Sequence, residues 1–244
     1  MRPSVAIVLP LYNPSGDWKE NFVKNIQEID SMLSSQVAIN YIVVNDGSDA
    51  FDIGSFFHSL KEQHNVAYLS YKENMGKGYA LRRGVREAVA DFVILTDFDF
   101  PYVMHNIREV IQQMLQGFDV VIGKRSKAYF KNLPLKRRII SKSYMLLSWI
   151  SFKLPLYDIQ SGIKGLGKKG KELFLETEVD RFLIDTEFVL RATRKNLVLK
   201  IVDVDLKENV AFSNFGINTI ITELKNFVTL IKLNRSLKQI GQYQ

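Results

Sequence analysis

Two acidic residues stand one residue apart at the end of an apolar segment. Residues 92–96 read FVILT and are followed by Asp97, Phe98 and Asp99. This pattern is typical of an interior parallel strand whose carboxyl end opens at the sheet edge, where open α/β sheets bind ligands. Side chains at i and i+2 of an extended chain point the same way, so the two carboxylates can share one divalent cation. The alternative is a turn in which Asp97 and Asp99 cap the following helix.

Two other polar groups follow strand-like apolar segments. Residues 5–9 lead into Pro10, Leu11, Tyr12 and Asn13, and residues 39–44 lead into Asn45, Asp46, Gly47 and Ser48. Asp46 can accept hydrogen bonds from a ribose or a base, while the glycine after it lets a ligand approach the backbone. A plain Asx turn accounts for the same residues.

A glycine-rich segment, Asn74-Met75-Gly76-Lys77-Gly78, opens one of the predicted helices. Its backbone N–H groups and its lysine can face a phosphate, because the N-terminus of a helix attracts anions. The spacing is not that of a Walker loop, and one G-x-G is no Rossmann fingerprint. This segment therefore does not define a site by itself.

The elements that must position these residues alternate along the chain. Apolar strand patterns recur over 5–9, 39–44, 66–69, 92–96 and 119–122, with helical patterns over 17–33, 52–63, 78–90 and 104–116. The alternation predicts an α/β fold with a mostly parallel sheet and helices on both faces, and it places the polar strand ends on one rim. No internal repeat or clear linker interrupts it, so we expect one catalytic domain over 1–212 and a helical tail over 213–244.

Composition and charge narrow the class of protein. The chain has 244 residues, 46% of them hydrophobic, and no cysteine, which suits a reducing compartment and excludes thiolate chemistry. No stretch reaches the roughly 20 apolar residues of a spanning helix, so no membrane crossing is expected.

The segment 120–157 holds nine Lys or Arg and no acid, and it alone accounts for the net charge of +7. This favours a local anionic partner, with a solvated basic loop as the alternative.

The set of motifs resembles the GT-A glycosyltransferases of family 2, and within them the dolichyl- or polyprenyl-phosphate sugar synthases. The similarity runs from about 5 to 235, through VAIVLPLYN, YIVVNDGSD, ENMGKGYALRRGV, VILTDFDFPYV, DVVIGKRS, LPLKRRIISKSY, LYDIQSGIKGL and FLIDTEFVLRATRKNLVLKIVDVDLKE. It implies a GT-A, Rossmann-like fold with a C-terminal amphipathic helix. The implied activity is inverting transfer of a hexose from a UDP- or GDP-sugar to a polyprenyl phosphate.

The resemblance also implies roles for particular residues. Asp97 and Asp99 would be the DxD pair that binds Mg²⁺ or Mn²⁺ on the donor diphosphate, with Asp99 taking part in catalysis and Lys77 close by. Asp158 would be the second catalytic residue, because it matches an acid that positions or activates the attacking oxygen.

The donor would be held by Pro10, Tyr12, Asn13 and Asp46, and donor or acceptor phosphate by Arg125, Arg137 and Ser141. Gln160, Ser161 and Gly162 would shape the adjoining wall. Asp185 and Glu187 match a DxE motif, with capping of their own helix as the alternative.

Two segments suggest contact with a membrane surface. The basic segment continues into YMLLSWISFKLPLY, which is too short to span a membrane and too apolar for a nucleic-acid interface. In the tail, Ile217, Ile220, Ile221, Leu224, Phe227, Val228 and Ile231 recur at helical spacing, with Lys225, Lys232, Arg235 and Lys238 available toward lipid headgroups. Packing in the protein's own core is the alternative for both. We expect a cytoplasmic protein peripheral to the inner face of a membrane, with a possible membrane subunit as partner and no nucleic acid.

Three residues depart from the family pattern. Asn45 replaces the first acid of the family's DDGS, Pro14 replaces the common acid after YN, and Pro101 stands where many synthases place a polar metal ligand. Two other functions stay open, the second of them because of Asn45 and Pro101. One is a glycosyltransferase acting on a saccharide or glycolipid hydroxyl, and the other is a sugar-nucleotide-binding subunit without turnover. His58, His64 and His105 show no ligand spacing.

Overall fold

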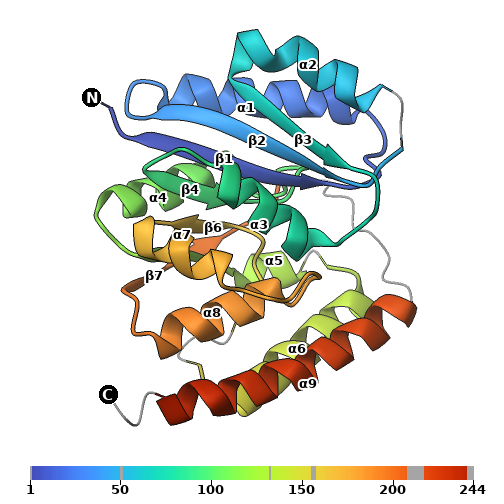
Figure 1. The fold of residues 1–244 in the computed structure, drawn as a ribbon, viewed down its shortest axis with the longest axis vertical. Coiled ribbons are helices and arrows are strands. Elements are labelled where there is room, and N and C mark those ends of the chain that lie inside the picture. The colour runs from blue at the N-terminus through green and yellow to red at the C-terminus, as the bar shows by residue number, and fades with distance from the viewer. Residues whose placement is uncertain (1, 50–51, 132, 155–157, 208–216, 241–244) are drawn as a thin grey trace.

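A single mixed sheet organises the protein. The computed structural model describes residues 2–49, 52–131, 133–154, 158–207 and 217–240. Seven strands follow the order β3-β2-β1-β4-β6-β5-β7 (Figure 1). They are β1 (Ser4–Leu11), β2 (Ala38–Asp46), β3 (Val66–Tyr71), β4 (Phe92–Leu95), β5 (Val120–Arg125), β6 (Lys164–Leu166) and β7 (Leu199–Val204). All neighbours pair in parallel except β6, which is antiparallel to both β4 and β5.

Helices cover both faces of this sheet. The strand β1 shows why, because Val5, Ile7 and Leu9 face one apolar cluster and Ala6 and Val8 face the other. One face is covered by α1 (Trp18–Leu33), α2 (Ile53–His64) and α4 (Met104–Leu115), and the other by α3 (Lys77–Glu87), α7 (Lys168–Leu175) and α8 (Ile184–Arg194). The prediction of a mostly parallel α/β fold with helices on both faces is confirmed. All five predicted strands and all four predicted helices are present within a few residues of their expected bounds.

The short α5 (Lys127–Lys131) and the long α6 (Leu135–Phe152) follow β5, and α9 (Ile217–Ile240) closes the described chain. Helices α6 and α9 lie side by side at one end of the molecule (Figure 1), and α9 also packs on α8. Leu230 of α9 is buried in the core, whereas Ile221, Leu224 and Val228 are exposed. The predicted tail helix is present, and its described apolar side chains divide between the core and solvent. The side chains of Ile217 and Ile220 lie outside the described part of the chain. The division at residue 212 stays a prediction, and residues 208–216 and 241–244 lie outside the described chain.

Helix lengths and hydropathy also bear on membrane crossing. Within the residues described above, no helix combines the length and the apolar composition that a membrane span requires.

Candidate active site

The two acids lie in a tight turn directly after β4. The backbone N–H of Phe100 donates to the Asp97 carbonyl at 3.1 Å, so the chain turns here. The extended conformation that was expected for residues 97–99 is therefore not present. Between the acids, the Phe98 ring stacks on Phe22 at 5.4 Å and lies 5.9 Å from Trp18. The helix-capping alternative is wrong, because α4 begins after Val103 and has no side-chain cap. The aromatic cluster under Phe98 therefore anchors a turn that holds both acids at the sheet edge.

Lys77, the first residue of α3, is ion-paired with the first of these acids. Its Nζ donates to Asp97 Oδ1 at 2.5 Å and lies 4.0 Å from Asp185 Oδ2. Burial lowers the pKa of Lys77, but the carboxylates of Asp97 and Asp185 outweigh it, so the pKa lies above its ordinary value. The predicted proximity of Lys77 to the acids is seen in the structure.

Gly162 lets the backbone of another segment approach the same carboxylate. A Cβ atom on Gly162 would overlap with Oδ2 of Asp97. Tyr102 holds this segment in place, since its hydroxyl accepts from the Gly162 N–H at 2.7 Å and from Ser161 Oγ at 3.2 Å. Gly162 therefore adjoins Asp97, and the predicted role of Gln160, Ser161 and Gly162 as a wall beside Asp158 stays a prediction.

Asp99 carries a carboxylate without an ion-pair partner among the described residues. Desolvation by the surrounding protein and the neighbouring Asp97 carboxylate raise the pKa of Asp99 to about 6. Two carboxylates, with the ammonium of Lys77 on Asp97 and the charge of Lys207 also acting on Asp99, form a donor set that fits a hard divalent cation. Over the described part of the chain, no group of three or more His, Cys, Asp or Glu side chains is placed to hold a metal. A cation bound here would need oxygen from a bound diphosphate or water as well.

Pro101 explains part of this shortage of protein ligands. It is buried, and its carbonyl accepts the backbone N–H of Lys207 at 2.8 Å. The residue therefore ties the segment after β7 to the acidic turn and offers no side-chain ligand.

A buried ion pair that the sequence did not reveal lies behind Lys77. Lys164 of β6 is wholly buried, and its Nζ donates to Asp185 Oδ1 at 2.5 Å and to the Ser161 carbonyl at 2.6 Å. Burial lowers the pKa of Lys164, against the opposing effect of the Asp185 carboxylate. The only sequence signal was a single lysine among apolar and small residues in SGIKGLG.

The two acids of the DxE motif have different roles in the fold. Asp185 faces Lys164 and Lys77, whereas Glu187 accepts from the backbone N–H groups of Glu178 and Val179 and from Arg191 Nε at 2.7 Å. Both acids are buried. Neither caps its own helix, since the cap of α8 makes no side-chain hydrogen bond. Asp185 therefore belongs to the charged network of the site, and Glu187 fixes the preceding loop.

Asp46 holds the segment that leads into Lys77. It is buried at the end of β2, and its carboxylate accepts from the N–H groups of Met75 (2.7 Å) and Gly76 (2.9 Å) and from Tyr71 Oη (2.9 Å). These contacts satisfy the acid within the protein. A donor base or ribose would have to compete with them, so the predicted donor contact of Asp46 remains a prediction.

The start of α3 does not offer its backbone to a phosphate. The N–H groups of Gly78 and Tyr79 donate to the Asp180 carbonyl at 2.7 and 3.3 Å. A Cβ atom on Gly76 would overlap that carbonyl, and one on Gly78 would overlap the carbonyl of Val179. The glycines therefore allow close packing on the 179–181 segment, and the phosphate-cradle interpretation is wrong for these N–H groups.

The predicted donor residues at and after the end of β1 lie on the same rim. Tyr12 and Asn13 are exposed, Pro10 is half-buried, and the Asn13 N–H donates to Ser48 Oγ at 2.8 Å. Asn45 orders that loop, because its amide donates to the Ser48 carbonyl (3.1 Å) and to Tyr68 Oη (3.0 Å). A carboxylate could not donate either bond, so the departure to asparagine fits this loop.

Asp158 and Arg125 form a second buried ion pair. Arg125 Nε and Nη2 donate to the two carboxylate oxygens at 2.8 and 2.6 Å, and the Arg125 N–H adds a third bond at 2.9 Å. The guanidinium lies 5.2 Å from the rings of Tyr129 and Phe130. Such bidentate geometry fixes the arginine firmly. The structure places Asp158 against Arg125, and its predicted catalytic role remains a prediction.

Arg137 and Ser141 lie on consecutive turns of α6. Burial lowers the pKa of Arg137, and the Tyr129 phenol opposes this effect. The ring of the same tyrosine lies against the Arg125 guanidinium. Ser141 Oγ is buried and has no hydrogen-bond partner among the described residues. A buried hydroxyl of this kind is costly unless a ligand or water satisfies it.

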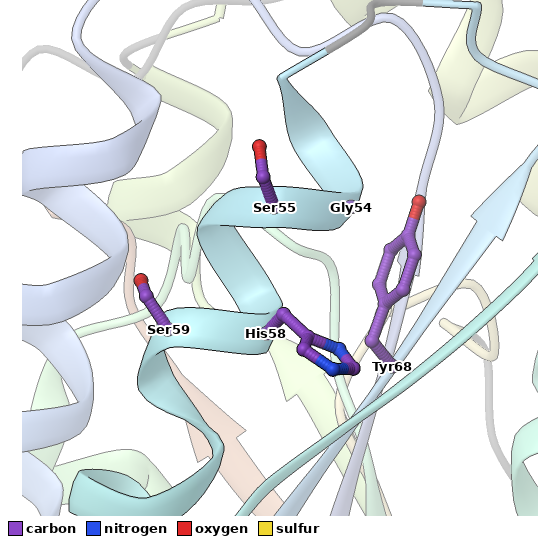
Figure 2. A pocket seen from close by; sticks show the side chains of 5 residues that line it. All are labelled: Gly54, Ser55, His58, Ser59 and Tyr68. Atoms are coloured by element: carbon purple, nitrogen blue, oxygen red, sulfur yellow. The ribbon is translucent and has the colours of Figure 1, made fainter.

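A shallow hollow of about 610 Å³ lies elsewhere, between α2 and β3 (Figure 2). Its lining residues are Gly54, Ser55, His58, Ser59 and Tyr68. Figure 2 shows the His58 ring of α2 beside the Tyr68 ring of β3. None of the predicted site residues lines it. Tyr68 connects it to the rim, through the hydrogen bond from Asn45.

The mostly parallel sheet, with helices on both faces, places this protein in the class of GT-A glycosyltransferase folds. The mannosyltransferase PcManGT from Pyrobaculum calidifontis, solved with GDP-Man and Mn²⁺, matches with a TM-score of 0.56 and 16% identity over 83% of this chain and 55% of its own. S. aureus TarS 1–349 matches with a TM-score of 0.52 and 15% identity over 83% of this chain and 58% of its own. At these identities the similarity concerns the fold.

The family follows from the sequence comparison. The family model "Glycosyl transferase family 2" matches residues 6–171, and the chain belongs to this family.

Its relatives include proteins named for dolichol-phosphate substrates. The dolichol-phosphate mannosyltransferase of Pyrococcus furiosus is 24% identical over 98% of this chain and 67% of its own length. The dolichyl-phosphate beta-glucosyltransferase ALG5A of Trichomonas vaginalis is 26% identical over 84% of this chain and 66% of its own. Glycosyltransferase AglD of Haloferax volcanii is 25% identical over 78% of this chain, which spans 31% of AglD.

Proposed function

We propose that this glycosyltransferase moves a hexose from a UDP- or GDP-sugar to a polyprenyl phosphate, with inversion at the anomeric carbon. The observation that carries the proposal is the Asp97–Asp99 pair at the sheet edge, with Lys77 ion-paired to Asp97. The names of the Pyrococcus and Trichomonas relatives support a lipid-phosphate acceptor.

Asp97 and Asp99 would hold Mg²⁺ or Mn²⁺ against the donor diphosphate. The bound cation would neutralise charge that develops as the nucleoside diphosphate departs. Lys77 adds a positive charge at the same place. The structure of PcManGT with GDP-Man and Mn²⁺ supports this use of a cation. Tyr12, Asn13 and Pro10 lie on the rim where the nucleoside would bind.

The acceptor phosphate would bind beside Arg125, Arg137 and Ser141. Arg125 is held in one orientation by Asp158, and the Ser141 hydroxyl lacks a partner among the described residues. An acceptor phosphate is already ionised at neutral pH, so it can attack without a strong general base. Asp158 would then act by positioning Arg125. Catalysis would rest on orientation and charge neutralisation.

The acceptor lipid requires the protein to reach a membrane surface. On α6, Leu135, Ile139, Leu146 and Ile150 recur at helical spacing and are all exposed, next to the basic residues of the same helix. An exposed apolar stripe flanked by cations fits a helix that lies in an anionic membrane interface. We therefore propose peripheral attachment at the inner face of the membrane, through α6 and the exposed residues of α9.

This attachment predicts a specific loss of vesicle binding. Leu146→Ser/Ile150→Ser should reduce co-flotation with phosphatidylglycerol-containing vesicles at least severalfold, because it removes apolar area from the stripe. Val89→Ser is the matched control, since Val89 is 92% exposed and lies outside α6 and α9. Equal binding by both variants and the wild type would rule out the stripe as the membrane contact.

Product release tests the reaction itself. UDP- and GDP-sugars are offered with Mn²⁺ or Mg²⁺, with and without a short-chain polyprenyl phosphate, to the wild type and to Arg137→Ala. We expect one nucleotide to be released only with the lipid phosphate present, and a strong reduction in the variant. Release with a saccharide acceptor that survives Arg137→Ala would favour transfer to a hydroxyl. Nucleotide binding without release from any donor would favour a subunit without turnover.

A further inference from the structure

Four charged side chains alternate in sign from the interior to the sheet edge. Lys164 Nζ donates to Asp185 Oδ1 at 2.5 Å, and Lys77 Nζ donates to Asp97 Oδ1 at 2.5 Å. Between these two pairs, Lys77 Nζ lies 4.0 Å from Asp185 Oδ2. The inner lysine is wholly buried, while the Asp97 side chain is 35% exposed. The series therefore runs Lys164, Asp185, Lys77, Asp97.

The contacts of Lys77 are unequal in a way that allows it to move. Its hydrogen bond goes to Asp97, but Asp185 Oδ2 accepts no hydrogen bond from the residues that the structure describes. Asp185 itself is held in place through Oδ1 by Lys164. A shift of about 1 Å by the flexible lysine stem would bring Nζ within hydrogen-bonding distance of Oδ2.

We propose that Lys77 is an internal counter-cation of Asp97 that transfers to Asp185 when a divalent cation binds the two acids of the turn. Lys164 and Asp185 are then positioning residues, because they hold the oxygen that receives Lys77. This inference rests on the metal site of the proposed function.

The physical reason is competition for one carboxylate. A divalent ion on Asp97 repels an ammonium that is hydrogen-bonded to the same group, and the repulsion is strong in a partly buried site. With Asp185 available, the ammonium keeps a negatively charged partner. In the free protein, Lys77 keeps Asp97 paired, so cation binding must displace it.

Mn²⁺ alone, without nucleotide, is the probe for this exchange. Free Mn²⁺ is measured by its electron paramagnetic resonance signal during titration of the full chain at pH 7.5. Lys77→Met should bind Mn²⁺ at least about tenfold more tightly than the wild type, because the competing cation is gone. Lys72→Met, which removes an exposed lysine from the loop that precedes α3, is the control and should bind like the wild type. Thermal unfolding of each variant verifies that it is folded.

A second variant tests the receiving oxygen. Lys164→Met/Asp185→Asn removes both charges of the buried pair, so no lone buried lysine remains. It should bind Mn²⁺ more weakly than the wild type, because the displaced Lys77 has lost its alternative partner. In the Lys77→Met background the same double substitution should have no effect. A merely structural role for the pair would weaken binding in both backgrounds.

Two outcomes overturn the proposal. The exchange is wrong if Lys77→Met binds Mn²⁺ no more tightly than Lys72→Met, even when sugar transfer to the lipid phosphate is demonstrated. If no variant binds Mn²⁺ with or without UDP or GDP, the metal site of the proposed function fails, and the exchange fails with it. Failure of lipid-dependent transfer alone concerns the acceptor and does not alter the Mn²⁺ result.

Discussion

Replacing Asp99 with asparagine is expected to lower the rate of sugar transfer by about a thousandfold without destabilising the fold. The amide keeps the shape of the side chain but removes one of the two negative charges proposed to hold the cation. Product release under saturating Mn²⁺, donor and lipid phosphate measures the effect. A variant that retains most of the wild-type rate would contradict the assignment of Asp99 to the metal site.

We also predict the direction in which Asp99→Asn changes the stability of the fold, and how that change depends on pH. The pKa of Asp99 is raised to about 6, so the ionised carboxylate is less favourable in the folded than in the unfolded chain. Its protonation stabilises the fold below the ordinary pKa, and this contribution is lost as the pH rises through about 6. Without divalent cations, Asp99→Asn should therefore be at least as stable as the wild type at pH 7.5. This advantage should shrink at pH 5.

A matched acid at the opposite edge of the sheet provides the control. Asp91 accepts the Ser4 N–H and hydroxyl, both at 2.7 Å, and these hydrogen bonds lower its pKa. Asp91→Asn should leave transfer unchanged and slightly reduce the melting temperature. Loss of transfer without loss of stability in Asp99→Asn, and loss of stability without loss of transfer in Asp91→Asn, would distinguish a functional acid from a structural one.

The second large effect concerns the buried pair behind the site. Asp185→Asn is expected to lower the free energy of unfolding by about 3–5 kcal/mol, because it leaves Lys164 wholly buried without a counter-charge. Lys164→Met should cost less, since Asp185 can then pair with Lys77 across the present 4.0 Å. Urea unfolding at pH 7.5 measures both. Equal costs for the two variants would contradict this asymmetry.

Alkaline pH provides a further test of the same pair. The pKa of Lys164 is lowered by burial, so the unfolded chain binds more protons than the folded one as the pH approaches the ordinary lysine value. The loss of stability in Asp185→Asn should therefore diminish between pH 7.5 and pH 10. The double variant Lys164→Met/Asp185→Asn has no lysine at this position and should show no such recovery.

The sequence allowed the sheet and the position of the acids to be predicted, because both depend on local patterns. Apolar runs such as 92–96 identified buried strands, and the residues after them identified the rim. The three-residue β6 carries no periodic signal, so its insertion between β4 and β5 could not be predicted. The bond between Lys164 and Asp185 depends on that insertion and was missed for the same reason.

The assignment of partners to polar residues was less successful, for a different reason. Residue type shows that Asp46 or Asp158 accepts hydrogen bonds, but not which donors reach it. Asp46 is satisfied largely by backbone N–H groups of a distant loop, and Asp158 by Arg125. The glycines at 76 and 78 likewise serve contacts with the 179–181 segment. Such contacts follow from the tertiary arrangement and leave no local pattern.

The antiparallel strand β6 also determines the order in which the chain can fold. Strands β1 to β4 pair with one another and are complete once residue 95 has been synthesised, but the outer edge of β4 stays open until residues 164–166 arrive. Within the described sheet, β5 pairs with β6 and β7, and neither partner has been synthesised during that interval. Open strand edges invite pairing with other chains. We therefore expect the nascent chain to be most prone to aggregation between the synthesis of β5 and that of β6.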